Sequence, residues 1–312
     1  MALRKKRDEL KETDTVEQAC DFYLHSPAFL KVSPSSQKQY ESNLRRACKT
    51  ETINGGFLGR VKLKDIRHKH IARSYDRWIF ESGIRTANYI IANLSIVFNM
   101  CIANEVMLFN PAGQVKKQTP KKRKIKWTPE QVKTFLDTAY SKWEWRSIGL
   151  IVHMAYEWSQ RLGDMRTLTW DEIDFDAQRL DLTQSKRGVD VHLPISDGLF
   201  RMLKQQHKEL GFQPYVAPNP SRLQGAYKCY SKTQISIIIN EIKKEANLPD
   251  ELWGMDMRRT AITEMLEAGV DMAGIMQVSG HQSPQSMVPY MVNTYAAASK
   301  ALSKRQAAKD ER

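Results

Sequence analysis

Five side chains in the second half of the chain are of types that could together break and rejoin a phosphodiester bond. Two arginines can bind the non-bridging oxygens bidentately, without a metal ion, where charge concentrates during displacement. A tyrosine hydroxyl can attack phosphorus and store the bond energy as a phosphotyrosine, so that rejoining needs no ATP. A lysine and a histidine can transfer or hold protons. The five candidates are Arg161, Lys186, Arg258, His281 and Tyr290.

Each candidate has a more ordinary interpretation when it is considered alone. A lone arginine is usually solvated or ion-paired, a Lys-Arg-Gly turn is common in exposed hairpins, and a histidine after glycine is often a capping residue. Tyr290 is one of eleven tyrosines, and Tyr295 lies only five residues further on. The functional interpretation therefore depends on all five elements occurring together in one order.

In order and spacing, residues 127–300 resemble the catalytic domain of the tyrosine recombinase, or phage integrase, family. Asp164, three places after the first arginine, takes the position of that family's supporting acidic residue. Five segments match in turn the family's first arginine box, hairpin lysine motif, H-x-x-R box, glycine-histidine pair and nucleophile: Ser159-Gln-Arg-Leu-Gly-Asp164, Thr183-Gln-Ser-Lys-Arg-Gly188, Met255-Asp-Met-Arg-Arg-Thr260, Gly280-His281 and Tyr290.

The resemblance implies a role for each of the five residues. Arg161 and Arg258 would bind the scissile phosphate, and Tyr290 would be the nucleophile. Lys186 would protonate the departing 5′ oxygen, and His281 would hydrogen-bond the phosphate and assist proton transfer. Chemistry of this kind requires neither a metal nor another cofactor.

The activity that the resemblance implies is site-specific recombination between two double-stranded DNA attachment sites. A homotetramer would act through a 3′-phosphotyrosyl intermediate and a Holliday junction, from protomers that are monomeric or weakly associated when free. The family's C-terminal helix docks on a neighbouring protomer, a part that residues 295–302 could play. The segments 170–174 and 258–260 look more like those of phage integrases than of chromosome-dimer resolvases. We therefore expect integration of phage or mobile-element DNA, aided by accessory DNA-bending or directionality proteins.

One departure from the family pattern leaves alternatives open. Met255 stands where the family usually has histidine, and a thioether cannot usefully transfer a proton. We expect a slower or differently tuned step rather than inactivity. The alternatives are a type IB topoisomerase, which shares this chemistry, and a DNA-binding protein that keeps the fold without the chemistry. Tyr295 is the alternative nucleophile, but the nine-residue spacing from His281 favours Tyr290.

The charge distribution indicates a polyanionic partner. The chain has a net charge of +13, and all of this excess lies in residues 1–126, which hold 25 Lys and Arg against 12 Asp and Glu. Neutralising phosphates releases counterions and favours nucleic acid as the partner. No apolar run approaches the roughly 18–20 residues of a membrane span, and the N-terminus lacks a signal-peptide pattern, so we expect a cytoplasmic protein. The four cysteines are widely spaced, and His68-x-His70 lacks a third ligand, so we expect neither disulfides nor a metal.

The pattern of helix signals predicts a mainly α protein of two domains. A basic leader, 1–12, precedes a helical core-binding bundle of the SAM-like type, 13–112. A basic linker, 113–126, then leads to a mostly helical catalytic domain, 127–312, in which alternating residues predict a hairpin at 179–183 and 189–193. Because the leader before residue 13 is short, we expect no separate arm-binding domain. The predicted DNA contacts are Arg45, Arg46, Lys121, Lys122, Arg123 and Lys124.

Overall fold

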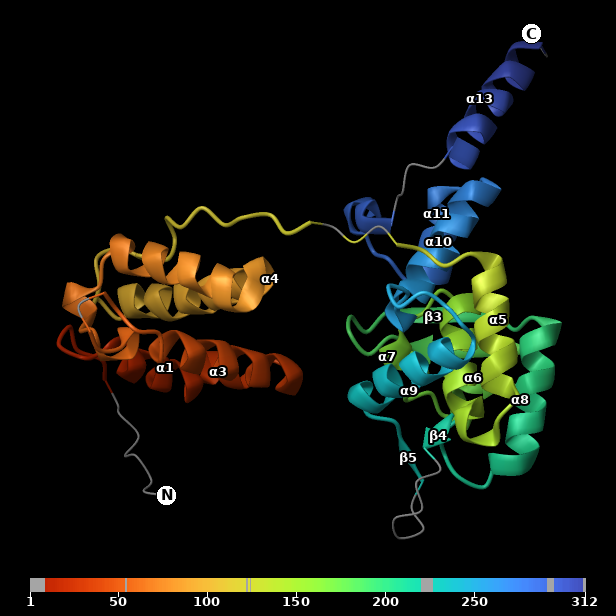
Figure 1. Cartoon of the computed structure of the whole chain (residues 1–312), viewed down its shortest axis with the longest axis horizontal. Coiled ribbons are helices and arrows are strands. Elements are labelled where there is room, and N and C mark those ends of the chain that lie inside the picture. Colours follow the sequence, from red (N-terminus) through yellow and green to blue (C-terminus); the bar gives the residue numbers. More distant parts are fainter. Residues whose placement is uncertain are drawn as a thin grey trace. The chain divides into compact units, whose positions relative to one another are not determined.

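The computed structural model describes residues 9–53, 55–121, 123, 125–219, 227–290 and 295–310. The chain divides into two compact units, residues 1–121 and 122–312 (Figure 1). The division falls within the range 113–126 that we predicted as a linker. A helical first unit and a helical second unit with small antiparallel sheets confirm the predicted fold class. Lys122 and Lys124 lie outside the described residues.

The first unit consists of helices around one apolar core. Its first helix begins at a capping box, where the Thr15 hydroxyl accepts from the Gln18 amide and the Gln18 side chain accepts from the Thr15 amide. A short helix begins at Pro27, and the next helix begins at Pro34. The helices are α1 (Val16–Leu24), α2 (Pro27–Leu30), α3 (Pro34–Cys48) and α4 (His68–Ala103).

Helix α4 is two helices joined at a sharp break. Gly83 has φ 79°, a left-handed conformation that glycine adopts without steric cost. The Tyr75 hydroxyl donates to the Asn88 side chain at 2.7 Å, although thirteen residues of straight helix would span about 20 Å. The two halves therefore fold back on each other, and α1 and α3 pack against them (Figure 1).

One stretch of α4 is apolar and long enough to span a membrane by composition alone. This differs from our expectation that no run approaches that length. The break at Gly83 interrupts the helix, and side chains of its second half, among them Ile90, Leu94 and Phe98, are fully buried in the core of the first unit. These residues therefore form protein core in this fold.

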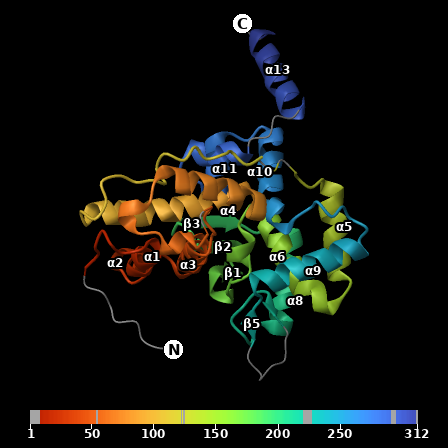
Figure 2. The same ribbon diagram turned by 60° about the vertical axis from the view of Figure 1, so that its left-hand side comes forward.

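The second unit is built around helix α6, which contacts α5, α7, α8, α9 and α10. Residues of α6, among them Ile148, Ile151 and Met154, are fully buried at its centre. Figure 2 shows these helices from a second direction. The helices are α5 (Pro129–Tyr140), α6 (Trp143–Glu157), α7 (Leu162–Met165), α8 (Asp197–Leu210), α9 (Lys232–Glu245), α10 (Met257–Ala268), α11 (Met272–Ser279), α12 (Pro284–Met287) and α13 (Tyr295–Asp310).

The main sheet of the second unit contains the predicted hairpin. Strands β2 (Arg179–Thr183) and β3 (Asp190–Pro194) pair antiparallel, and β1 (Ile173–Asp174) adds to the other edge of β2. A second small sheet joins β4 (Pro218–Asn219) to β5 (Lys228–Cys229) and was not predicted. The turn of this hairpin, which carries Lys186, lies close to α7, because Ser185 donates to Asp164 of that helix.

Candidate active site

Arg161 is positioned by an unusual turn after α6. Ser159 has φ 52°, a left-handed conformation that costs a non-glycine residue about 1–2 kcal/mol. The turn places Arg161 at the start of α7, where its Nη1 donates to Gln184 Oε1 at 2.8 Å and lies 3.6 Å from Asp164 Oδ2. A quarter of the Arg161 side chain is exposed, so its guanidinium is accessible to a ligand while these contacts hold it in place.

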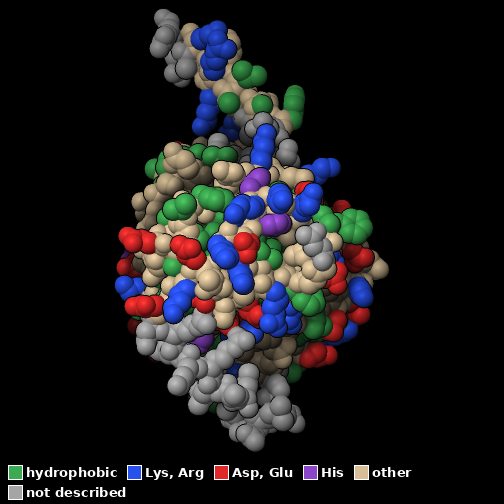
Figure 3. Space-filling model, turned by 90° about the vertical axis from the view of Figure 1, so that its left-hand side faces the viewer, with side chains coloured by type: hydrophobic (Ala, Val, Ile, Leu, Met, Phe, Trp, Pro, Cys, Tyr) green, Lys and Arg blue, Asp and Glu red, His purple; other side chains and the backbone are tan. Residues whose placement is uncertain are grey.

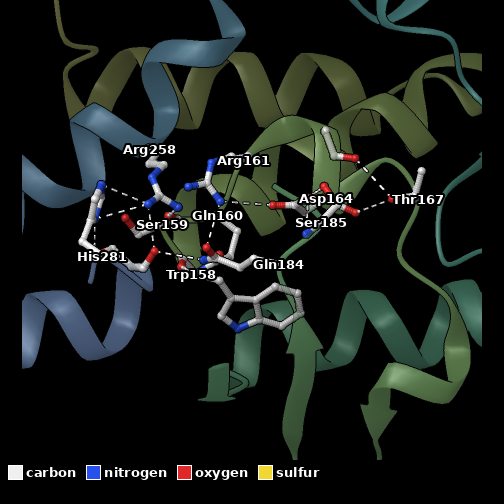
Figure 4. A network of polar contacts seen from close by, with 12 residues as sticks. Trp158, Ser159, Gln160, Arg161, Asp164, Thr167, Gln184, Ser185, Arg258 and His281 are labelled. Atoms are coloured by element: carbon white, nitrogen blue, oxygen red, sulfur yellow. Dashed lines mark hydrogen bonds and ion pairs between the residues drawn. The ribbon is translucent and has the colours of Figure 1, made fainter. Parts of the chain in front are cut away.

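Arg258, on the first turn of α10, is almost completely buried and lies beside Arg161 (Figure 4). Its Nη1 donates to the Ser159 carbonyl at 3.1 Å, and its Nη2 donates to the Ser279 carbonyl at 2.8 Å. Burial and the neighbouring Arg161 charge lower the pKa of Arg258 to about 10. The guanidinium is still charged at neutral pH, in surroundings that favour an added anion.

His281 completes this side of the cluster from the turn after α11. Its Nδ1 lies 2.7 Å from the Ser279 hydroxyl, and its ring nitrogens lie 3.2 and 3.3 Å from Arg258 Nη2. Burial, followed by the charges of Arg258, Arg161 and Arg187, lowers the pKa of His281 to about 4. The ring is therefore neutral at pH 7 and can both donate and accept a hydrogen bond.

Tyr290 lies in the same cluster. Its ring meets the His281 ring edge-on, with centroids 5.0 Å apart, and its hydroxyl interacts with Arg258 and opposes the lowering of the Arg258 pKa. Thr263 donates to the Tyr290 carbonyl at 3.4 Å, and the ring packs on a small apolar group that includes Met287. By contrast, Tyr295 begins α13 and is 89% exposed. Of these two tyrosines, the structure brings only Tyr290 to the arginines.

Lys186 occupies the exposed turn between β2 and β3. The Gln184 amide donates to the Val189 carbonyl at 2.8 Å, and the Gly188 amide donates to the Gln184 carbonyl at 2.9 Å. Gly188 has φ 62°, which this tight turn requires. The turn fixes the backbone at Lys186 and leaves its long side chain exposed.

The comparison with known families agrees with this geometry. Residues 126–299, more than half of the chain, match the phage integrase family. The chain belongs to the phage integrase family. Its members are tyrosine recombinases, and the matched range contains all five candidates.

Two characterised proteins resemble this family member in sequence. ICEBs1 integrase of Bacillus subtilis (strain 168) is 26% identical over 141 residues, which cover 44% of this chain and 37% of that protein. Tyrosine recombinase XerA of Pyrococcus furiosus is 28% identical over 204 residues, which cover 64% of this chain and 67% of that protein. The chain therefore aligns with little more than a third of the first relative and two thirds of the second.

Solved structures of integrases share the fold. A lambda integrase dimer bound to a COC′ core site superimposes with a TM-score of 0.73 at 21% identity, covering 88% of this chain and 77% of that one. The Tn1549 transposon integrase in complex with circular intermediate DNA gives a TM-score of 0.73 at 16% identity, covering 93% of this chain and 99% of that one. A lambda integrase tetramer bound to a Holliday junction gives a TM-score of 0.72 at 21% identity, covering 87% of this chain and 79% of that one.

Met255, the departure from the family pattern, lies in the short 3-10 helix Gly254–Asp256 that precedes α10. Its side chain is 68% exposed, whereas Arg258, three residues later, is buried. The first turn of α10 is held instead through Asp256, which pairs with Arg123 at 2.7 Å. The fold therefore keeps Arg258 in place without a histidine at position 255.

The predicted DNA contacts differ in their surroundings. Arg45 and Arg46 are exposed on α3 and line a surface hollow of about 570 Å³, together with other basic residues. Arg45 pairs with Glu41, and Arg46 donates to Ser82. Lys121 is exposed. Arg123 differs because its side chain is mostly buried. Its guanidinium pairs with Asp256 and stacks 3.9 Å from the Trp253 ring centroid.

Sequence patterns did not indicate the buried polar residues that connect this site. Gln160 and Gln184 are fully buried, and each bonds to groups on other segments of the second unit. A glutamine beside a motif arginine is indistinguishable from a surface glutamine in a single sequence. Among the described residues, no group of three or more His, Cys, Asp or Glu side chains could hold a metal ion.

Proposed function

We propose that this chain is a site-specific DNA recombinase that integrates phage or mobile-element DNA through a 3′-phosphotyrosyl intermediate. The observation that carries the proposal is the assembly of Arg161, Arg258, His281 and Tyr290 into one cluster, from segments up to 129 residues apart in sequence. Two adjacent guanidinium groups with a neutral histidine form a site for a phosphodiester anion. The Tyr290 hydroxyl interacts with Arg258, as expected of a nucleophile held against the phosphate site.

The chemistry follows from these positions. The Tyr290 oxygen attacks phosphorus, the bond to the 5′ oxygen breaks, and the 3′ phosphate stays on the tyrosine. The phenol proton passes to a neutral base, for which His281 is the candidate, and Lys186 gives a proton to the departing 5′ oxygen. A 5′ hydroxyl from the other DNA site then attacks the phosphotyrosine and frees Tyr290. The number of phosphoester bonds is conserved at each step.

The two arginines would stabilise the negative charge that develops in this reaction. In the transition state, negative charge increases on the non-bridging oxygens, which Arg161 and Arg258 would hold from fixed hydrogen bonds. Because folding has already placed both guanidinium groups, little reorganisation remains for the moment of reaction.

The test is covalent capture from a pool of nicked duplexes with randomised core sequences. Cleavage next to the nick releases a short fragment, so the protein stays attached, and the captured DNA also reveals the core sequence. Tyr290→Phe should bind the recovered core but form no adduct, whereas the control Tyr295→Phe should form adducts, and mass spectrometry should find DNA on the peptide containing Tyr290. If the wild-type chain forms no adduct, the recombinase proposal fails, and the alternative of a DNA-binding protein without the chemistry remains. Supercoil relaxation without two-site products would identify a topoisomerase.

The proposed assembly is a homotetramer on two attachment sites in the cytoplasm, with accessory DNA-bending or directionality proteins. The solved relatives include dimers on core sites and a tetramer on a Holliday junction. In this chain the described side chains of α13 are largely exposed, as a helix that docks on a neighbouring protomer requires. Deletion of 295–312 should preserve DNA binding and abolish the tetrameric complex in native gels.

DNA binding is proposed to use the basic residues of the first unit and the linker, within a 13–112 core-binding domain and a 113–126 linker. On the face in Figure 3, Lys and Arg side chains gather centrally, with Asp and Glu mostly towards the margins. Replacing Lys121 by Gln should reduce the salt slope of binding by about one for the lost phosphate contact. Arg123→Gln is the comparison, since its charge already pairs with Asp256, and its slope should change less.

A further inference from the structure

We infer that Gln184 is a positioning residue that orients Arg161 and ties the Lys186 turn to the rest of the active site. The inference rests on the proposed function and deepens it. Gln184 is fully buried, so its side chain does not touch a ligand itself. It lies two residues before Lys186, and it contacts Arg161 and Gln160 of the first arginine box and Ser279, which precedes the Gly280–His281 pair (Figure 4).

Each polar atom of the Gln184 side chain has a partner. Its Oε1 accepts from Arg161 Nη1 at 2.8 Å, and its Nε2 donates to Gln160 Oε1 at 2.6 Å and to the Ser279 carbonyl at 3.0 Å. A primary amide has one acceptor and two donor hydrogens, and both donors are used. Because the site is buried, losing any of these bonds would leave an unsatisfied polar group.

The same partners connect Gln184 to Arg258. The Ser279 carbonyl that accepts from Gln184 also accepts from Arg258 Nη2 at 2.8 Å. One carbonyl oxygen therefore joins the amide that holds the first arginine to the guanidinium of the second. A movement of Gln184 would therefore change the hydrogen bonds of both arginines.

Steric contact with Gly280 fixes Gln184 from the other side. A Cβ at position 280 would lie 2.5 Å from Gln184 Nε2 and 2.8 Å from its Cδ. Only glycine leaves room for the amide, which accounts for the glycine before His281 in structural terms. The hydrogen bonds and this contact allow Gln184 little freedom to move.

The chemical reason for an amide at this position is its neutrality. A carboxylate would also accept from Arg161, but its negative charge would oppose the binding of a phosphate. Gln184 orients the guanidinium and leaves its positive charge for the ligand. The turn that begins at Gln184 also fixes the backbone of Lys186, so one residue would coordinate charge stabilisation with leaving-group protonation.

The test compares Gln184→Met with the matched control Gln206→Met. Gln206 is also a buried glutamine of the second unit, and it donates to the Val216 carbonyl at 3.2 Å, away from the arginines. Adduct formation is measured on the captured core with a phosphodiester and with a methylphosphonate at the scissile position. The methylphosphonate lacks one charged oxygen and so depends less on Arg161. Misplacing a reacting group by about 1 Å can cost on the order of 100-fold in rate.

On the phosphodiester, Gln184→Met should form adducts about 10- to 100-fold more slowly, with nearly unchanged DNA binding. On the methylphosphonate, the loss should be much smaller, as it should be for Arg161→Ala. Gln206→Met should behave like the wild type on both substrates. An equal loss for Gln184→Met on both substrates would mean a merely structural role and would overturn the inference.

Two further measurements keep the inference testable. If Gln184→Met does not fold, Gln184→Asn provides a polar side chain that is too short to reach Arg161 and Ser279 together, and it should show the same substrate dependence. Binding of inorganic phosphate to the full chain, followed by NMR of the arginine side chains, needs no DNA. Weaker phosphate binding by either variant supports the inference, and unchanged binding contradicts it, even if the wild type forms no adducts and the recombinase proposal fails.

Discussion

Replacing Gly280 by alanine should destabilise the second unit far more than the same change at Gly269. Both glycines end a helix in the left-handed region, Gly280 after α11 with φ 66° and Gly269 after α10 with φ 80°. A Cβ at Gly280 would meet Gln184 at 2.5 Å, whereas at Gly269 it would meet the flexible ends of Lys300 at 3.1 Å and Lys304 at 3.3 Å. The pair therefore separates backbone strain from the contact with the active-site amide.

The magnitude follows from these contacts. Left-handed backbone costs an alanine about 1–2 kcal/mol at either position. At Gly280 the buried amide of Gln184 must also move, which weakens its bond to the charged Arg161, worth about 1.5–3 kcal/mol. We expect a gap of about 2–3 kcal/mol between the two variants, which for a unit of this size corresponds to about 4–12 °C in Tm.

Scanning calorimetry of the full-length chain measures this gap, because the two units can give separate transitions. The transition of the second unit should shift strongly for Gly280→Ala and weakly for Gly269→Ala. In Gly280→Ala, Gln184→Met should then cost less than in the wild type, since the amide is already displaced. Equal shifts for both glycine variants, or fully additive losses, would refute the reasoning.

The remaining predictions concern charge and pairing. Arg258→Lys keeps the charge but cannot bond both carbonyls, so adduct formation should fall at least about 100-fold, and wild-type rates would contradict this. The pKa of His281, about 4, lies below the usual 6.5, so the unfolded chain binds a proton at higher pH than the folded chain does. The free energy of unfolding should therefore fall as the pH drops from 6.5 to 4. Urea unfolding should show a smaller fall in His281→Gln. Met255→His should change the adduct rate less than about tenfold, since position 255 is exposed. Arg123→Ala should lower the Tm of the second unit, as it leaves buried Asp256 without this partner.

Residues of the candidate site could be selected from the sequence because the expected reaction restricts their types. Phosphate requires arginine-like donors, and the phosphotyrosine mechanism requires tyrosine, so these residues stand out at fixed spacing. Capping signals are similarly local, since Thr128 accepts from the Gln131 amide and precedes the first residue of α5. The alternating hairpin around Lys186 also matched, with β3 displaced by one residue.

Features that depend on distant segments could not be predicted in this way. The fold-back of α4 is set by one glycine, and the residues 68–82 before it have no pattern that requires a helix of that length. Gln184 gains its importance only when Ser279, 95 residues away, supplies a carbonyl. Arg123 looked like part of a free basic run, and its pairing with Asp256 spans 133 residues.

The partners of the two arginines explain how this site can be both buried and ready for an anion. Arg258 donates to two carbonyls, and Arg161 donates to an amide, so these bonds fix direction without cancelling charge. The nearest carboxylate, Asp164, lies 3.6 Å from Arg161 and is also occupied by Ser185. Burial, and then the neighbouring charge of Arg161, lower the pKa of Arg258, so the charged guanidinium is less stable here than in water. A phosphodiester bound as proposed would stabilise both guanidinium groups, and a transition state with more charge on its oxygens would stabilise them further.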